Sequence, residues 1–141
     1  MEISVIISTY NHPKWLEKTL WGYQFQSFRD FEVIIADDGS GQATADIINK
    51  AQRELDFPIK HVWHKDNGFQ KSTILNKATL ATEKEYLLFT DGDCIPHPEF
   101  LSTHVKLAAE GQFLSGGYCK LPIELSRLIT KDDIQSGRAF D

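Results

Sequence analysis

The stretch Tyr86-Leu87-Leu88-Phe89-Thr90-Asp91-Gly92-Asp93 decides how this sequence is interpreted. Residues 86–90 form a short run of apolar, aromatic and β-branched side chains, which is typical of a strand buried on both faces. Two carboxylates follow at i and i+2, so their side chains share one face of an extended segment. Gly92 between them lets the backbone turn or approach a ligand closely. Taken alone, an Asp-X-Asp segment also fits a solvated acidic turn, so its meaning depends on its surroundings.

Outward from this stretch, strand patterns alternate with helix patterns. Continuous apolar runs predict strands at 3–8 and 31–36, with weaker candidates at 59–64 and 112–115. Apolar residues at helical spacing predict helices over about 13–23, 45–55, 74–81 and 101–108. Pro13 suits a helix start and Gly111 a helix end.

This alternation indicates an α/β fold, Rossmann-like, with a mainly parallel central sheet and right-handed crossovers. A chain of 141 residues is enough for one ordinary core, so we expect a single domain over 1–141. In sheets of this kind, ligands bind outside the carboxyl ends of the strands. The residues that directly follow each strand are therefore the first candidates for chemistry.

Polar clusters follow three of the predicted strands at once. They are Ser8-Thr9-Tyr10-Asn11, Asp37-Asp38-Gly39-Ser40 and Asp91-Gly92-Asp93. Because the carboxyl ends of parallel strands meet at one edge, we expect the three clusters to converge there. That convergence favours a binding site over three unrelated turns.

The individual side chains allow more than one interpretation. Tyr10 is placed to stack on a nucleobase, or it is a partly buried loop aromatic. Asp38 can accept from a base N–H or a ribose hydroxyl, whereas Gly39 and Ser40 also suit a turn and a helix cap. Lys71 falls at the start of a predicted helix, where N–H groups favour an anion, or it is simply solvated.

Asp91 and Asp93 offer the hard oxygen ligands that Mg²⁺ and Mn²⁺ prefer. Mg²⁺ is typically held by one or two carboxylates together with ligand phosphates, so this pair is sufficient. His97 lies four residues after Asp93, close enough to approach a metal, although a surface histidine is the simpler interpretation. The histidines show no spacing of the zinc type, and Trp15, Trp21 and Trp63 are expected in the core or at its rim.

Composition limits the function class. A net charge of −5 argues against a duplex nucleic-acid binder, which needs a basic face. No apolar run approaches the roughly 20 residues that span a bilayer, and the N-terminus lacks the basic start of a signal peptide. We therefore expect a cytoplasmic chain, in which Cys94 and Cys119 are reduced thiols.

Together these motifs resemble the family 2 glycosyltransferases of the GT-A fold. The match runs from Ile3 to about Phe100 and includes Asn67-Gly68 as well as the three clusters. The stretch from Asn67 to Pro96 is most similar to the bacterial branch of chondroitin-polymerase-type enzymes. Leu75 and Gln70 depart from the family, because some members carry Arg at the corresponding positions.

The resemblance implies a role for each matching residue. Tyr10 and Ser8 would line the base pocket, Asp38 would accept from the uracil N–H, and Lys71 would contact the base or a phosphate. Asp91 would approach the ribose and the metal, and Asp93 would ligate the Mn²⁺ or Mg²⁺ that bridges the two phosphates. Gly92, between these two carboxylates, would also contribute to nucleotide-sugar binding.

The resemblance also implies transfer of a sugar from a UDP-sugar to the hydroxyl of a glycan or other acceptor, with inversion, in polysaccharide or glycan synthesis. Family members carry an acceptor-binding half with an acidic base after the metal motif. No such base is identified here, since Asp132, Asp133 and Asp141 lie in a polar tail that has no matching context. We therefore expect the acceptor-binding part to lie after residue 141 and the 141 residues alone to transfer sugar poorly. Peripheral membrane association of a longer parent protein is compatible with this interpretation.

Three other classes are weighed against this interpretation. A nucleotidyltransferase would need a glycine-rich phosphate loop near the N-terminus, which the sequence lacks. A phosphate-accepting regulatory domain would need acidic residues after the first strand, where Ser8-Thr9-Tyr10 stands. A non-catalytic nucleotide-binding or interaction module remains as the alternative.

Overall fold

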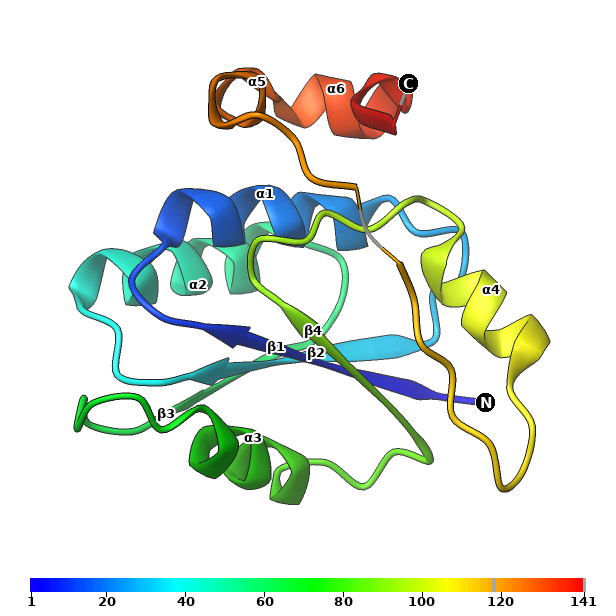
Figure 1. The fold of residues 1–141 in the computed structure, drawn as a ribbon, viewed down its shortest axis with the longest axis horizontal. Helices are drawn as coiled ribbons and strands as arrows, with labels where there is room; N and C mark the ends of the chain where they lie inside the picture. Colours follow the sequence, from blue (N-terminus) through cyan, green and yellow to red (C-terminus); the bar gives the residue numbers. More distant parts are fainter. Residues whose placement is uncertain (118, 141) are drawn as a thin grey trace.

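A parallel sheet forms the centre of the molecule in a computed structural model that describes residues 1–117 and 119–140; Asp141 lies outside the described residues. Its strands, in the spatial order β3-β2-β1-β4, are all parallel to their neighbours (Figure 1). They span Ile3–Thr9 (β1), Phe31–Asp37 (β2), Ile59–Trp63 (β3) and Tyr86–Asp91 (β4). The strands predicted at 3–8, 31–36, 59–64 and 86–90 are thus confirmed.

Helices cover both faces of the sheet. In Figure 1, α1 and α2 lie on one face and α3 on the other, while α5 and α6 lie on the outer side of α1. The helices span Pro13–Gln24 (α1), Gln42–Glu54 (α2), Lys71–Leu80 (α3), Phe100–Leu107 (α4), Ile123–Leu128 (α5) and Lys131–Ser136 (α6), and Arg138–Phe140 is a 3-10 helix.

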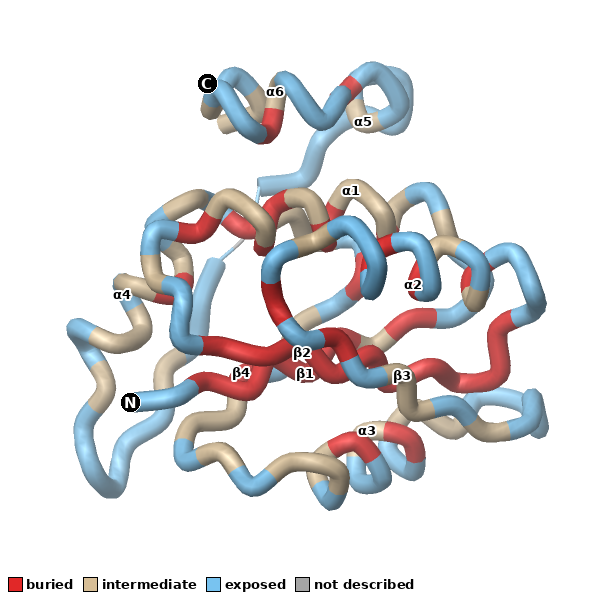
Figure 2. Tube along the Cα trace, turned by 180° about the vertical axis from the view of Figure 1, so that it is seen from behind, coloured by how far each residue is buried: buried red, intermediate tan, exposed pale blue. Residues whose placement is uncertain are grey.

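The hydrophobic core has two parts because strand side chains alternate between the faces. On the face of α1 and α2, Ile7 and Val33 pack with Leu16, Leu20 and other buried residues. The α3 face carries a smaller cluster of Ile6, Ile34, Ala36, Ile74 and Ala78. Figure 2 shows β1 and β2 as the most continuously buried part of the chain, between the helical layers. The edge strands β3 and β4 are only partly buried, and Phe89 of β4 is 54% exposed, so the expectation that 86–90 is buried on both faces is wrong. Packing on both faces of the sheet therefore fixes the positions of the strand ends, from which the candidate residues project.

The predicted strand at 112–115 is wrong. These residues adopt no regular structure, and Phe113 is 91% exposed. A four-residue run can form a strand only beside a partner strand, and within the described residues this segment pairs with none. Trp63 also departs from expectation, because it is 51% exposed and donates its indole N–H to the Ser40 carbonyl at 3.0 Å.

Two further sequence expectations concern helices and thiols. None of the helices in the described part of the chain is both long and apolar enough to cross a membrane. Cys94 is half-buried and Cys119 is exposed, and both are free thiols.

Candidate functional site

Asp91 ends β4 directly opposite Ser8 of β1, so the register of the sheet brings two of the predicted clusters together. The Ser8 hydroxyl donates to Asp91 Oδ1 at 2.8 Å, and Lys71 Nζ reaches the same oxygen at 3.0 Å. Partial burial alone would raise the pKa of Asp91, but the Lys71 ammonium and the Ser8 hydroxyl outweigh it and hold the pKa below its usual value. The Asp91 carboxyl is therefore ionised at neutral pH.

A candidate metal centre follows directly along the chain. One ligand atom each from Asp91, Asp93 and Cys94 lies within 4.8 Å of the others. Both carboxylates are exposed, and the Cys94 thiol donates to Asp93 Oδ1 at 3.6 Å. Burial, with the Asp93 charge beside it, raises the pKa of the Cys94 thiol, which makes the sulfur a poorer ligand than the carboxylates. This donor set fits a divalent cation that prefers oxygen ligands.

Cys94 was not predicted as a member of this group, and its signal in the sequence was only its position next to Asp93. His97 was considered as a ligand, yet it does not belong to the group. Its ring packs edge-on against Phe140, at 5.2 Å between ring centroids, and its Nδ1 accepts the Glu99 N–H at 3.1 Å. His97 is a surface residue that helps shape the loop.

Asp38 lies at the same edge, but inside the protein. Its Oδ1 pairs with His64 Nε2 at 2.6 Å, and its Oδ2 accepts the backbone N–H of Gln70 at 2.9 Å. The residue is only 7% exposed. The Asp38 carboxylate thus takes one of the N–H groups at the start of α3 that the sequence suggested for an external anion. A carboxylate has about four acceptor positions, so it retains capacity for one more donor.

Tyr10 projects from the end of β1 and is 43% exposed, as a stacking aromatic must be. Its hydroxyl donates to Asp66 Oδ2 at 2.6 Å. This hydrogen bond and the negative charge of Asp66 raise the pKa of Tyr10. Asp66 was missed by sequence reasoning, because nothing in the sequence shows that residue 66 reaches residue 10.

Gly39 explains how the Asp66 loop comes so close. It has φ +99°, and a Cβ there would lie 2.5 Å from Asp66 Cα. Only glycine combines that backbone conformation with that contact. The loop after β3 therefore lies directly on the turn after β2, and this arrangement places Tyr10, Asp38 and Asp66 along one edge.

Ser40 does not cap α2, contrary to one of its two predicted roles. The N-cap is Gly41, which makes no side-chain cap bond. The Ser40 hydroxyl instead accepts the Asn11 N–H at 2.8 Å, and Asn11 Oδ1 accepts the Gly41 N–H at 2.8 Å. Asn11 adopts a left-handed backbone, φ 51°, which asparagine tolerates better than most residues. These bonds join the end of β1 to the end of β2.

Gly92 contacts β1. Its N–H donates to the Ser8 carbonyl at 2.9 Å. A Cβ at this position would lie 3.2 Å from both that carbonyl oxygen and Thr9 Oγ1. The sequence predicted that the Gly92 backbone could approach a ligand closely, but in the structure it approaches β1. This contact holds the acidic segment beside the end of β1.

Asp37 lies beneath this edge and is 1% exposed. It accepts from the Ser40 N–H at 2.9 Å and pairs with His61 Nε2 at 2.8 Å. Burial would raise its pKa, yet the His61 and Ser40 hydrogen bonds hold the pKa below its usual value. Asp37 therefore supports the turn while Asp38 beside it faces the α3 side.

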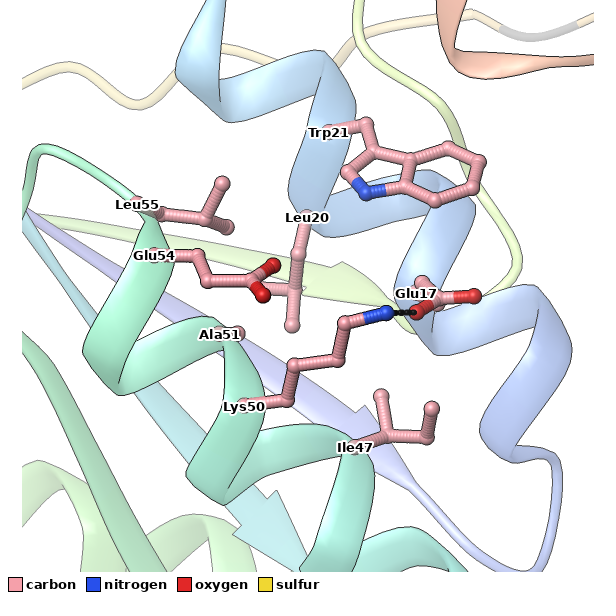
Figure 3. Close-up of a pocket in the computed structure, with 8 residues that line it drawn as sticks. All are labelled: Glu17, Leu20, Trp21, Ile47, Lys50, Ala51, Glu54 and Leu55. Atoms are coloured by element: carbon pink, nitrogen blue, oxygen red, sulfur yellow. Dashed lines mark hydrogen bonds and ion pairs between the residues drawn. The ribbon is translucent and has the colours of Figure 1, made fainter.

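A pocket elsewhere in the molecule carries no comparable chemistry. It lies between α1 and α2 and is lined by Leu20, Trp21, Ile47, Ala51 and neighbouring residues (Figure 3). Its polar contact is an ion pair of 3.5 Å between Lys50 and Glu17. These residues form a helix–helix interface, so the carboxyl edge of the sheet is the stronger candidate site.

Comparison with known proteins relates this geometry to a family. A sequence profile described as Glycosyl transferase family 2 matches residues 4–118. The chain is 34% identical over 108 residues to chondroitin synthase from Escherichia coli, covering 76% of this chain and 16% of that protein. It is 35% identical over 104 residues to hyaluronan synthase from Pasteurella multocida, covering 73% of this chain and 10% of that protein. The chain thus spans only a small part of these relatives.

A solved structure shares the architecture. TarS from Staphylococcus aureus in complex with UDP-GlcNAc superposes with a TM-score of 0.63 at 30% identity, covering 75% of this chain and 30% of that chain. The parallel sheet with helices on both faces is accordingly a GT-A arrangement, as the sequence motifs predicted.

Proposed function

The chain belongs to glycosyl transferase family 2, and from that premise we propose that its carboxyl edge binds a UDP-sugar through a divalent metal. The observation that carries the proposal is the meeting of three polar strand ends. Ser8 and Asp91 share a hydrogen bond, and the acidic group continues through Asp93. In parallel sheets with helices on both faces, this edge is where ligands bind.

The base side of the proposed site consists of Tyr10, Ser8 and Asp38. Tyr10 offers an exposed ring for stacking on uracil, and its hydrogen bond to Asp66 restricts where the ring can lie. Asp38 has acceptor capacity left for the uracil N–H. A solved relative, TarS, binds UDP-GlcNAc, which supports a uridine donor here.

The metal side consists of Asp91 and Asp93, with Gly92 between them. Mn²⁺ or Mg²⁺ held by these carboxylates would act as a Lewis acid that offsets charge on the departing diphosphate. Lys71 lies within reach of the same edge, so its ammonium would add a second positive charge toward a phosphate. This arrangement of negative and positive side chains supports a metal-bound diphosphate at this edge.

We further propose that the reaction is inverting transfer of the sugar to a glycan hydroxyl in polysaccharide synthesis. Chondroitin synthase and hyaluronan synthase are named for such polymers, which supports this direction. Direct attack of the acceptor hydroxyl on the anomeric carbon requires a general base, which is assigned to none of the residues named above.

Titration calorimetry of UDP with and without Mn²⁺ tests the proposal. We expect binding that depends on the metal, and its loss in Asp93→Asn, because the amide removes a charged metal ligand. Asp132→Asn is the matched control, since Asp132 is an acidic residue of α6, outside the proposed site. UDP binding whose affinity depends neither on the metal nor on Asp93 would contradict the proposal and favour a non-catalytic interaction module.

A further inference from the structure

The segment after β4 is held by buried polar contacts to α1, a helix that carries none of the proposed ligands. Thr19 of α1 is fully buried, and its hydroxyl donates to the Gly92 carbonyl at 2.8 Å. That carbonyl stands between Asp91 and Asp93, the two proposed metal ligands. In Figure 1 the chain that leaves β4 passes alongside α1 before it reaches α4.

Gly22 provides a second contact, three residues further along α1. A Cβ at this position would lie 2.5 Å from Pro96 Cδ and 2.9 Å from Pro96 Cγ. Distances this short mean that any larger side chain must displace the proline ring. The segment after Cys94 therefore lies directly on the surface of α1.

Gln26 provides a third contact just beyond the end of α1, and it is 3% exposed. Its side-chain amide donates to the His97 carbonyl at 2.8 Å and accepts the Leu101 N–H at 3.0 Å. It also donates to the Gly22 carbonyl at 3.1 Å, so one side chain joins the helix end to the loop. Both ends of the stretch from 97 to 101 are thus fixed by Gln26.

Thr19 and Gly22 stand at i and i+3, which places them on one face of the helix, and Gln26 extends these contacts just beyond the helix end. We propose that this face of α1 positions the acidic segment, and that Thr19 is a positioning residue for Asp93, the proposed ligand that directly follows Gly92. The inference rests on the proposed function, since it assigns a task to the loop that would hold the metal. An unpaired Gly92 carbonyl would leave the backbone between the two ligands able to rotate.

The chain offers a matched control for removing the Thr19 hydroxyl. Thr44 of α2 is also buried, at 1% exposure, but within the described residues its hydroxyl has no hydrogen-bond partner. Thr19→Val and Thr44→Val therefore make the same chemical change, and only the first removes a hydrogen bond to the loop. Thr19→Ser keeps the hydroxyl and is the rescue variant.

Two readouts separate positioning from general stability. The first is amide hydrogen exchange at Cys94, whose N–H donates to the Asp91 carbonyl at 3.2 Å. The second is the Mn²⁺-dependent affinity for UDP. We expect Thr19→Val to speed exchange at Cys94 and to weaken the affinity about fivefold, the factor that one neutral hydrogen bond is worth. Thr19→Ser should stay close to the wild type, and Thr44→Val should change neither readout.

The outcomes are distinguishable. Faster exchange together with weaker binding in Thr19→Val alone supports the inference. Unchanged affinity in Thr19→Val, with or without faster exchange, overturns it, because the hydroxyl would then hold the loop without placing the ligands. Failure of the proposed function would instead appear in the wild type, as an absence of metal-dependent UDP binding, and it would remove the positioning role as well.

Discussion

At the scale of single residues, Asp91 of β4 receives side-chain contacts from two other elements. Ser8 of β1 and Lys71 of α3 both reach its Oδ1. The Lys71 ammonium therefore lies where the positive charge of a metal is proposed to act. The contact is partly exposed, so its contribution to stability is small, but its effect on a nearby cation is direct.

Replacing Lys71 by Met should separate metal binding from nucleotide binding. Without nucleotide, Mn²⁺ should bind about fivefold more tightly, since roughly 1 kcal/mol of charge repulsion is removed. Metal-dependent UDP binding should weaken, because a phosphate contact is lost. Electron paramagnetic resonance of free Mn²⁺ measures the first effect and calorimetry the second. Lys84→Met is the control, since Lys84 pairs with Glu2 at 3.0 Å away from the proposed site; equal behaviour of the two variants would contradict the assignment.

Asp37 should stabilise the fold in a manner that depends on pH. Its folded-state pKa lies below the usual 3.8, so its stabilisation is fully present above that pH and is lost as the pH falls through the folded value. Asp37→Asn should therefore lower the free energy of unfolding by about 2 kcal/mol at pH 7, the cost of disrupting a buried hydrogen-bonded carboxylate. Urea unfolding between pH 7 and pH 3 should show the difference shrinking below pH 4. A difference that grows as the pH falls below 4 would refute this account.

At the scale of elements, the loops at the strand ends carry the candidate site, and contacts with neighbouring elements hold these loops in place. The turn after β2 and the loop after β3 are in backbone contact at Gly39, and the loop after β4 is in contact with α1 at Gly22. Both contacts depend on a missing side chain. The loops that carry the candidate site are thus held by packing against neighbouring elements.

Gly39→Ala tests the first of these contacts. It should destabilise the protein by more than the roughly 1–2 kcal/mol that left-handed backbone costs a residue with a Cβ, because Asp66 must also move. Gly111→Ala is the matched control: Gly111 has φ +74° and nothing within 4 Å of its Cβ position. Denaturant unfolding compares the two variants. Equal losses of stability would show that the Asp66 contact is unimportant.

The sequence predicted the strands where an apolar run was long enough to be recognised. Continuous apolar runs predicted β1, β2 and β4, and the polar residues after them were correctly expected at one edge. The run at 112–115 misled, because a strand also needs a partner that no local pattern reveals. Thr19 and Asp66 were missed for a related reason: their partners, Gly92 and Tyr10, are 73 and 56 residues away.

At the scale of the whole molecule, carboxylates gather at both ends of the sheet. The carboxyl end carries Asp91 and Asp93, whereas the opposite end has a pocket lined by Glu2, Asp30 and Glu32 among others. At that opposite end Lys84 pairs with Glu2, and Lys60 with Glu32 at 3.2 Å. At the carboxyl end Lys71 pairs with Asp91, but among the described residues no basic side chain pairs with Asp93. The carboxyl end combines exposed carboxylates with loops that are held by packing, and we therefore propose the metal site there.

Paramagnetic broadening by Mn²⁺ in the presence of UDP tests that placement most directly. Amide signals lose intensity steeply with proximity to the ion, so a heteronuclear NMR spectrum of this 16.1 kDa chain maps its position. The account predicts that the amides of Ser8, Asp91 and Cys94 vanish at low Mn²⁺ while those of Glu2 and Lys84 persist. Broadening centred on Glu2 and Lys84, or spread evenly over the surface, would contradict it.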